Sequence, residues 1–136
     1  MSSPGCLLHV VGGRPLSVHF SLVNPAEAEA EVRVPALLGP VGAFVTIEVA
    51  DADGRPVYGS QRPKIKLKLD PSVRESYVVL RPGNTYGILL VVDRDDLWLE
   101  PGEYTVRATY SNREFTGPSD DPIGAQNCSA TADLSL

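Results

Sequence analysis

The sequence contains few residues of the kinds on which enzymes and metal sites depend. It has two histidines, two cysteines and one tryptophan in 136 residues. No serine or cysteine stands in a nucleophile motif such as G-x-S-x-G, so no catalytic centre is indicated. The sequence therefore predicts a protein that is not an enzyme and that has no cofactor.

The two histidines, His9 and His19, both fall within predicted strands near the N-terminus. They would come together if the first two strands pair, and imidazole is a common metal ligand, so a two-histidine metal site is one interpretation. No third ligand lies near them in the sequence. The favoured interpretation is therefore that both are surface or edge histidines.

Cysteine is equally scarce, with Cys6 and Cys128 near opposite ends of the chain and no C-x-x-C motif. A disulfide between them would require the first and last strands to run side by side. The segment from Met1 to Gly5 shows no secretion signal, and the cytosol keeps thiols reduced. We therefore expect two independent, partly buried thiols. We also expect a cytoplasmic location, or a mature fragment that restarts with an artificial methionine.

Long apolar runs and excess positive charge are both missing. The longest apolar run, Gly87 to Val92, is far shorter than the roughly 20 residues that span a bilayer. The net charge is −5, and nucleic-acid affinity depends largely on clustered Lys and Arg. The sequence thus predicts no membrane insertion and no nucleic-acid partner.

What the chain has in quantity is alternation of apolar and polar residues with a period of two, which is typical of half-buried strands. The apolar positions form five such runs: Leu16, Val18, Phe20 and Leu22; Val45, Ile47 and Val49; Ile65, Leu67 and Leu69; Tyr104, Val106, Ala108 and Tyr110; and Ala130, Ala132, Leu134 and Leu136. Helical spacing is not sustained anywhere. The pattern predicts one all-β domain over residues 1–136, with eight to ten antiparallel strands.

Two further segments are predicted with less regular patterns. In Tyr86 to Val92 both faces are apolar, so we expect a central strand whose second face is covered by a loop or a neighbour. In Pro25 to Val34 we expect a loop that leads into a short strand at Glu29 to Val34, which Pro35 ends.

Turn residues separate these runs at the spacing of a β-sandwich, and Asp51-Ala-Asp-Gly54 is predicted to form a hairpin turn. One extended loop remains, from Ser111 to Gln126. Loops of this length in a compact domain are often functional. We predict that it is an interaction loop, with Phe115, Asp120 and Asp121 as its candidate contact residues.

The segment Leu99-Glu-Pro-Gly-Glu-Tyr104 is similar to a tyrosine corner, in which a tyrosine hydroxyl returns to the backbone of the preceding turn. Together with the strand order, it resembles bacterial immunoglobulin-like and fibronectin type III-like domains. More loosely, it is similar to sandwich-type proteinase-inhibitor and accessory domains. The resemblance implies an immunoglobulin-like antiparallel β-sandwich with Greek-key connections, structural roles for Tyr104, Leu99 and Gly102, and no active site.

Other candidate sites have simpler interpretations. Asp93, Asp95 and Asp96 in one loop, and Asp51 and Asp53 in another, offer carboxylates to calcium, but aspartate is also favoured in ordinary turns. Lys64, Lys66 and Lys68 form a positive stripe that is typical of a protected edge strand. Phe44, Tyr77 and Phe115 are candidates for exposed binding aromatics, although core packing or plugging of a loop is the favoured interpretation for each. Asn127-Cys-Ser129 is a glycosylation sequon.

These observations favour a non-enzymatic protein-interaction or scaffolding domain, whose protein partner the sequence does not identify. Two alternatives stay open at this point. One is a β-sandwich proteinase inhibitor, which would present an exposed loop to a protease. The other is a calcium- or carbohydrate-dependent adhesion module.

Overall fold

The computed structural model describes residues 3–61, 69–92 and 97–136, and it contains nine strands within them. Their bounds are β1 (Gly5–Gly13), β2 (Leu16–Val23), β3 (Val32–Pro35), β4 (Val45–Asp51), β5 (Pro56–Gly59), β6 (Tyr77–Leu80), β7 (Thr85–Val91), β8 (Glu103–Ser111) and β9 (Asn127–Ser135). The helical structure in these residues is one 3-10 turn, η1 (Arg74–Ser76). No helix among them is long and apolar enough to cross a membrane.

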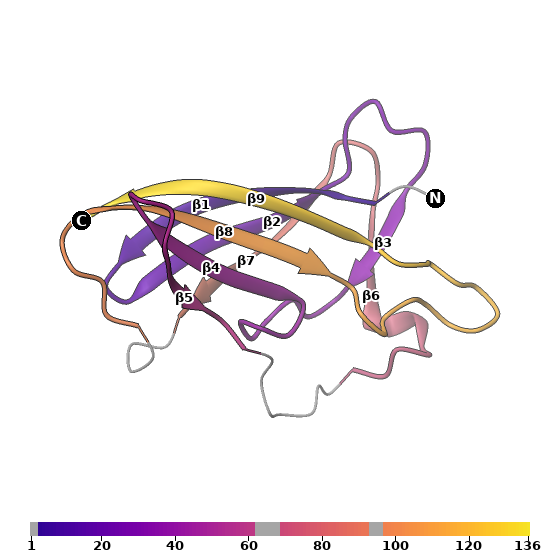
Figure 1. Cartoon of the computed structure of the whole chain (residues 1–136). Coiled ribbons are helices and arrows are strands. Elements are labelled where there is room, and N and C mark those ends of the chain that lie inside the picture. Colours follow the sequence, from indigo (N-terminus) through magenta and orange to yellow (C-terminus); the bar gives the residue numbers. More distant parts are fainter. Residues whose placement is uncertain (1–2, 62–68, 93–96) are drawn as a thin grey trace.

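The strands form antiparallel sheets, so the prediction of an all-β chain is confirmed. One sheet has the order β1-β2-β7, a second has the order β5-β4-β8-β9, and β3 pairs with β6 in a short ladder. Figure 1 shows the three-stranded and four-stranded sheets layered on each other, with β1 and β9 side by side. The arrangement is that of a sandwich.

The core lies between the two larger sheets, because alternate residues of each strand face inward. Leu16, Val18, Phe20 and Leu22 of β2 are all fully buried, and the inward residues of β4 and β8 pack against them. These are the apolar positions of three of the five period-two runs, so those three predictions are confirmed. In the last run Leu134 is buried, whereas Leu136 follows β9 and is exposed. The predicted strand that contains Lys64, Lys66 and Lys68 lies outside the described residues except for Leu69.

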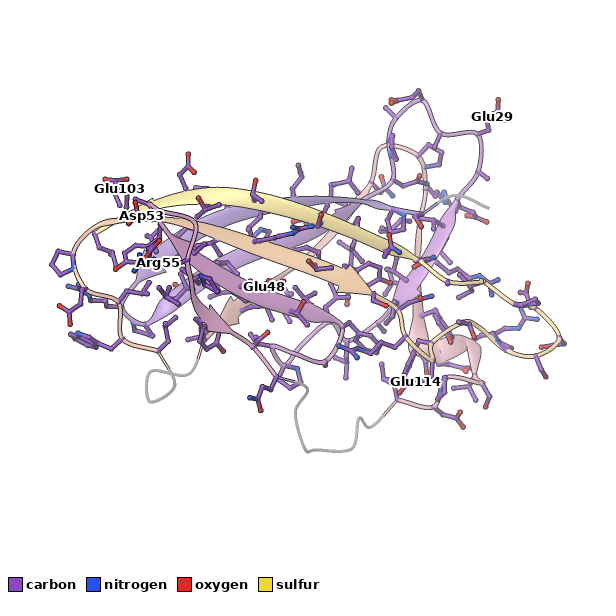
Figure 2. All side chains as sticks on the ribbon, in the orientation of Figure 1. Glu29, Glu48, Asp53, Arg55, Glu103 and Glu114 are labelled. Carbon is purple, nitrogen blue, oxygen red and sulfur yellow. A yellow bond between two sulfur atoms is a disulfide. The ribbon has the colours of Figure 1, made fainter. Side chains whose placement is uncertain are left out.

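The hairpin prediction is also confirmed, since β4 and β5 pair around Asp51 to Gly54. Gly54 has φ of +80°, a conformation that suits glycine. Asp51 organises the turn, because its Oδ1 accepts hydrogen bonds from the backbone N–H groups of Asp53 and Arg55, each at 2.9 Å. Both turn residues labelled in Figure 2, Asp53 and Arg55, lie at this end of β4.

Two strand predictions need correction. β7 is not central within the described residues: it pairs with β2 alone, and its second face is open, with Leu89 and Val91 each 54% exposed. The apolar residues on the second face of β7 are therefore not buried by another described part of this chain. The short strand before Pro35 begins at Val32, three residues after the predicted start, because the preceding segment turns around Asn24, whose side chain donates to the carbonyl of Ala30.

The prediction of two free thiols is wrong. Cys6 and Cys128 form a disulfide, with their Cα atoms 5.9 Å apart. The physical reason is topological: β1 lies beside β9, so residues from the two ends of the chain become neighbours across the two sheets. The bond joins the three-stranded sheet to the four-stranded one.

Candidate interaction surfaces

The three residues predicted at the tyrosine corner lie together at the start of β8. The hydroxyl of Tyr104 donates a 2.7 Å hydrogen bond to the carbonyl of Glu100 in the preceding turn. Leu99 is buried, and its carbonyl accepts from the guanidinium of Arg14. Gly102 exchanges two backbone hydrogen bonds with Leu136. These contacts hold the turn to the chain end and present no reactive group.

The long loop between β8 and β9 is held from inside by one buried amide. Nδ2 of Asn112 donates to the carbonyls of Phe115 and Gly124, at 3.0 and 2.8 Å, and its Oδ1 accepts from the backbone N–H of Gln126 at 2.9 Å. All three hydrogen bonds are internal to the loop, so Asn112 fixes the loop's shape.

Phe115, a candidate contact residue of this loop, is buried. Its ring meets Phe44 edge-on at 4.9 Å and lies 6.0 Å from the ring of Tyr77. All three rings are buried and together fill the space under the loop, which agrees with the favoured interpretation of core packing or loop plugging and not with the exposed-aromatic alternative. Burial raises the pKa of Tyr77, whose hydroxyl donates to the carbonyl of Pro71 and accepts from the N–H of Gly117.

The two acidic candidates of the loop differ from each other. Asp121 forms a two-oxygen contact with the guanidinium of Arg33, at 3.0 and 3.1 Å, and also contacts Arg74 at 3.1 Å. Asp120 is exposed, and among the described residues its ion-pair contact is a long one, 3.8 Å to Arg74. Of the predicted loop residues, Asp120 is therefore the one whose side chain is free to meet a partner without breaking a close internal contact.

The calcium candidates find no support in the described residues. Asp51 is used by its own turn, and Asp93, Asp95 and Asp96 lie outside the described residues. Within the part of the chain that the structure describes, no group of three or more histidine, cysteine or acidic side chains is placed to hold a metal ion.

The most unusual surface is the outer face of the three-stranded sheet, which sequence reasoning did not single out. We call it the uncharged face. Its positions on β1, β2 and β7 are Gly5, Leu7, His9, Val11, Ser17, His19, Ser21, Val23, Thr85, Gly87, Leu89 and Val91. None of these residues is Asp, Glu, Lys or Arg. Leu7, Val11, Leu89 and Val91 are each more than half exposed.

The outer face of the four-stranded sheet offers an internal comparison. Exposed positions on β4, β8 and β9 include Glu48, Glu103, Thr105, Arg107, Ser129, Thr131 and Asp133. The sheet also has one exposed aliphatic side chain among its described strands, Val57 of the edge strand β5, which is 44% exposed. Figure 2 shows Glu48 and Glu103 on this sheet. One face of the same sandwich thus carries the charged and polar residues typical of a solvated surface, whereas the other does not.

The two histidines lie at the centre of the uncharged face. The register of β1 and β2 places His9 directly opposite His19, and both are exposed. The imidazole of His19 lies beside Gly87 on the neighbouring β7. A Cβ at position 87 would come within 2.9 Å of Cε1 of that ring, so glycine makes room for it.

A recess of about 220 Å³ lies close to the end of this sheet and is lined by Arg14, Pro15, Leu97 and Trp98. The guanidinium carbon of Arg14 lies 5.2 Å from the centre of the Trp98 ring, within cation–π range. Trp98 is 65% exposed. In the sequence, Trp98 lies in a connecting loop outside every alternating run, and this position could have identified it as an exposed side chain.

The sequence was also compared with known proteins. No model of a protein family matches the chain, and no curated protein matches it either.

Proposed function

We propose that this chain is a non-enzymatic protein-interaction domain that binds its partner through the uncharged face. The observation that supports this most is the contrast between the two outer faces of one sandwich. The partner surface it fits is flat, apolar and without charged groups, on another protein.

Physical chemistry favours such a partner. Burial of aliphatic surface contributes about 25 cal/mol per Å², and Leu7, Val11, Leu89 and Val91 offer that surface together. A charged partner surface would lose its hydration here and find no opposite charge on β1, β2 or β7. The four aliphatic side chains form two groups, Leu7 with Val11 on β1 and Leu89 with Val91 on β7, separated by Ser17, His19 and Ser21 of β2. Exposed apolar patches commonly mark interaction sites.

We further propose an immunoglobulin-like Greek-key sandwich as the fold. The strand orders β1-β2-β7 and β5-β4-β8-β9 follow the A-B-E and C′-C-F-G orders of that family. The hydrogen bond from Tyr104 to the carbonyl of Glu100, just before the eighth strand, supports the same proposal. Sandwiches of this type serve many unrelated binding functions, so the fold supports an interaction role without naming the partner.

An oxidising compartment is part of the proposal. The disulfide between Cys6 and Cys128 favours the cell exterior, a periplasm or a secretory lumen over the cytosol, because disulfides persist where thiols are not kept reduced.

The test compares two double variants in a partner-capture experiment from the native source, followed by binding measurements with the purified partner. Leu89→Lys with Val91→Lys adds charge to the uncharged face, and we expect loss of the captured partner. Thr105→Lys with Thr131→Lys adds the same charge to the opposite outer face, where both residues are exposed, and should leave capture unchanged.

Two results would count against the uncharged face as the binding surface, and a third would overturn the proposed partner. A partner retained equally by both variants would bind elsewhere. A partner lost only on Asp120→Ala would place binding on the loop from Ser111 to Gln126. Self-association of the pure wild-type chain, abolished by the first variant, would show that a second copy covers the face.

A second candidate function is carbohydrate binding at the recess beside Trp98. An exposed indole with a guanidinium on one side is the kind of platform on which sugars stack, and Arg14 adds hydrogen-bond donors. Titration with a glycan panel, measured by calorimetry, tests this, because Trp98 is the chain's single tryptophan and its variant would have no tryptophan fluorescence. A response that vanishes in Trp98→Ala supports it, and no response across the panel rejects it.

A further inference from the structure

We infer that His9 and His19 form a two-histidine binding site for a late first-row transition-metal ion, with Cu²⁺, Ni²⁺ and Zn²⁺ as the candidate ions. The site lies within the uncharged face, but the inference does not rest on protein recognition there. It rests on the register of the first two strands and on the chemistry of imidazole.

The register supplies the geometry. Directly opposed residues of an antiparallel pair have Cβ atoms about 4.5 to 5.5 Å apart, and His9 and His19 are such a pair on the same outer face. Metal–imidazole bonds are about 2.0 to 2.1 Å long. Two rings on adjacent strands can therefore rotate about their side-chain bonds to hold one ion between them.

Both rings are accessible to solvent. The ring of His19 lies over Gly87 of β7, on the side of β2 away from β1, so it must rotate about its side-chain bonds to face His9. The remaining coordination positions of the ion would be taken by water, which makes the site open and exchangeable and distinguishes it from a closed structural zinc site.

The hydrogen-bond partner of His19 suits metal binding. Oγ of Ser21 lies 3.4 Å from Nδ1 of His19, where it can accept the N–H of that nitrogen. A proton held at Nδ1 leaves the lone pair of Nε2 for the ion, which is how outer groups commonly orient metal-binding histidines.

Charge and ligand type define the ion. No Lys or Arg lies on the outer face of β1, β2 or β7 to repel a cation, and the chain carries a net charge of −5. Imidazole suits copper, nickel and zinc, whereas calcium and magnesium require oxygen ligands, which two histidines do not provide. Affinity should follow the usual order for nitrogen sites, with Cu²⁺ bound most tightly.

The experiment is a titration of the full, disulfide-bonded chain with each ion, by calorimetry and by NMR of the imidazole protons. His9→Gln and His19→Gln should each weaken binding by at least about tenfold, since loss of even an outer-shell partner typically lowers metal affinity about 10- to 100-fold. The variant that carries both substitutions measures how much metal ion the rest of the chain binds.

A matched control keeps one histidine on each strand and moves the histidine of β2 out of register, onto the buried position of Ser21. The exchange His19→Ser with Ser21→His places the second histidine opposite Leu7, diagonal to His9. We expect it to bind about as weakly as the single variants. Circular dichroism checks that each variant is folded.

The outcomes are decisive in both directions. A shift of both imidazole signals at one metal equivalent, lost in the two single variants, the double variant and the exchanged-register control, supports the site. Unchanged affinity in either single variant overturns it, as does full affinity in the exchanged-register control. A stronger response to Ca²⁺ than to Ni²⁺ would also overturn it, because it would indicate an oxygen site.

Discussion

The hydroxyl of Tyr110 donates a 2.9 Å hydrogen bond to Oε1 of Gln126, with both side chains inside the molecule. Nε2 of the same glutamine donates to the carbonyl of Arg33 on β3, and its backbone N–H donates to Oδ1 of Asn112. One side chain thus connects β8, the loop that follows it and the short β3–β6 ladder. This small polar network fixes how the loop returns to the sheet.

Tyr110→Phe should destabilise the fold by about 1 to 3 kcal/mol, because it leaves a buried amide oxygen without its donor. Urea unfolding followed by fluorescence measures this. Tyr104→Phe is the matched control: its lost hydrogen bond to Glu100 lies at the surface, where water replaces it. A loss from Tyr110→Phe no larger than from Tyr104→Phe would contradict the role of the buried network.

Stability should fall in alkaline solution. Burial raises the pKa of Tyr110 above its ordinary value of 10.0, with a smaller contribution from Tyr77. Because the folded-state pKa is raised, the stabilising contribution is fully present below pH 10 and is lost as pH rises through the folded-state pKa. Unfolding free energies measured between pH 8 and pH 11 should decline, and the decline should be shallower in Tyr110→Phe. Equal slopes would exclude Tyr110 as the cause.

Reduction of the disulfide should lower stability without changing the fold. The bond joins residues separated by 122 positions, and in the chain-entropy model a loop of this size is worth about 4 to 5 kcal/mol. Urea unfolding of wild type with and without reductant, and of Cys6→Ser with Cys128→Ser, tests this. The double variant should match the reduced protein. An intact-mass measurement that shows two free thiols in purified, unreduced protein would contradict the bond itself.

Asp121→Asn should destabilise the fold by about 0.5 to 1 kcal/mol, a modest amount because the pair with Arg33 is partly exposed and screened by water. The side chains of Arg33 and Asp121 are 24% and 42% exposed. Asp120→Asn is the matched control, with a 3.8 Å contact between two largely exposed groups, and should have no measurable effect. Added salt should reduce the difference in unfolding free energy between the two variants. Equal destabilisation by both would show that Asp121 holds the loop no better than Asp120.

Local patterns in the sequence determined much of this structure. The alternation from Leu16 to Leu22 identifies both the strand and its buried face, because a strand turns successive side chains to opposite sides. The hairpin at Asp51 to Gly54 and the hydrogen bond from Tyr104 to Glu100 involve residues four or fewer positions apart. Contacts this short depend on turn chemistry that the sequence displays directly.

Only the tertiary structure decided what covers each face and which distant residues meet. Alternation shows that Leu89 and Val91 share a side of β7, but whether this chain buries that side depends on the other layers, and they leave it open. The pairing of Cys6 with Cys128, the opposition of His9 and His19, and the burial of Phe115 all depend on strand order and register. These are set by the packing of the whole chain, since contacts between distant residues form only when the sheets assemble.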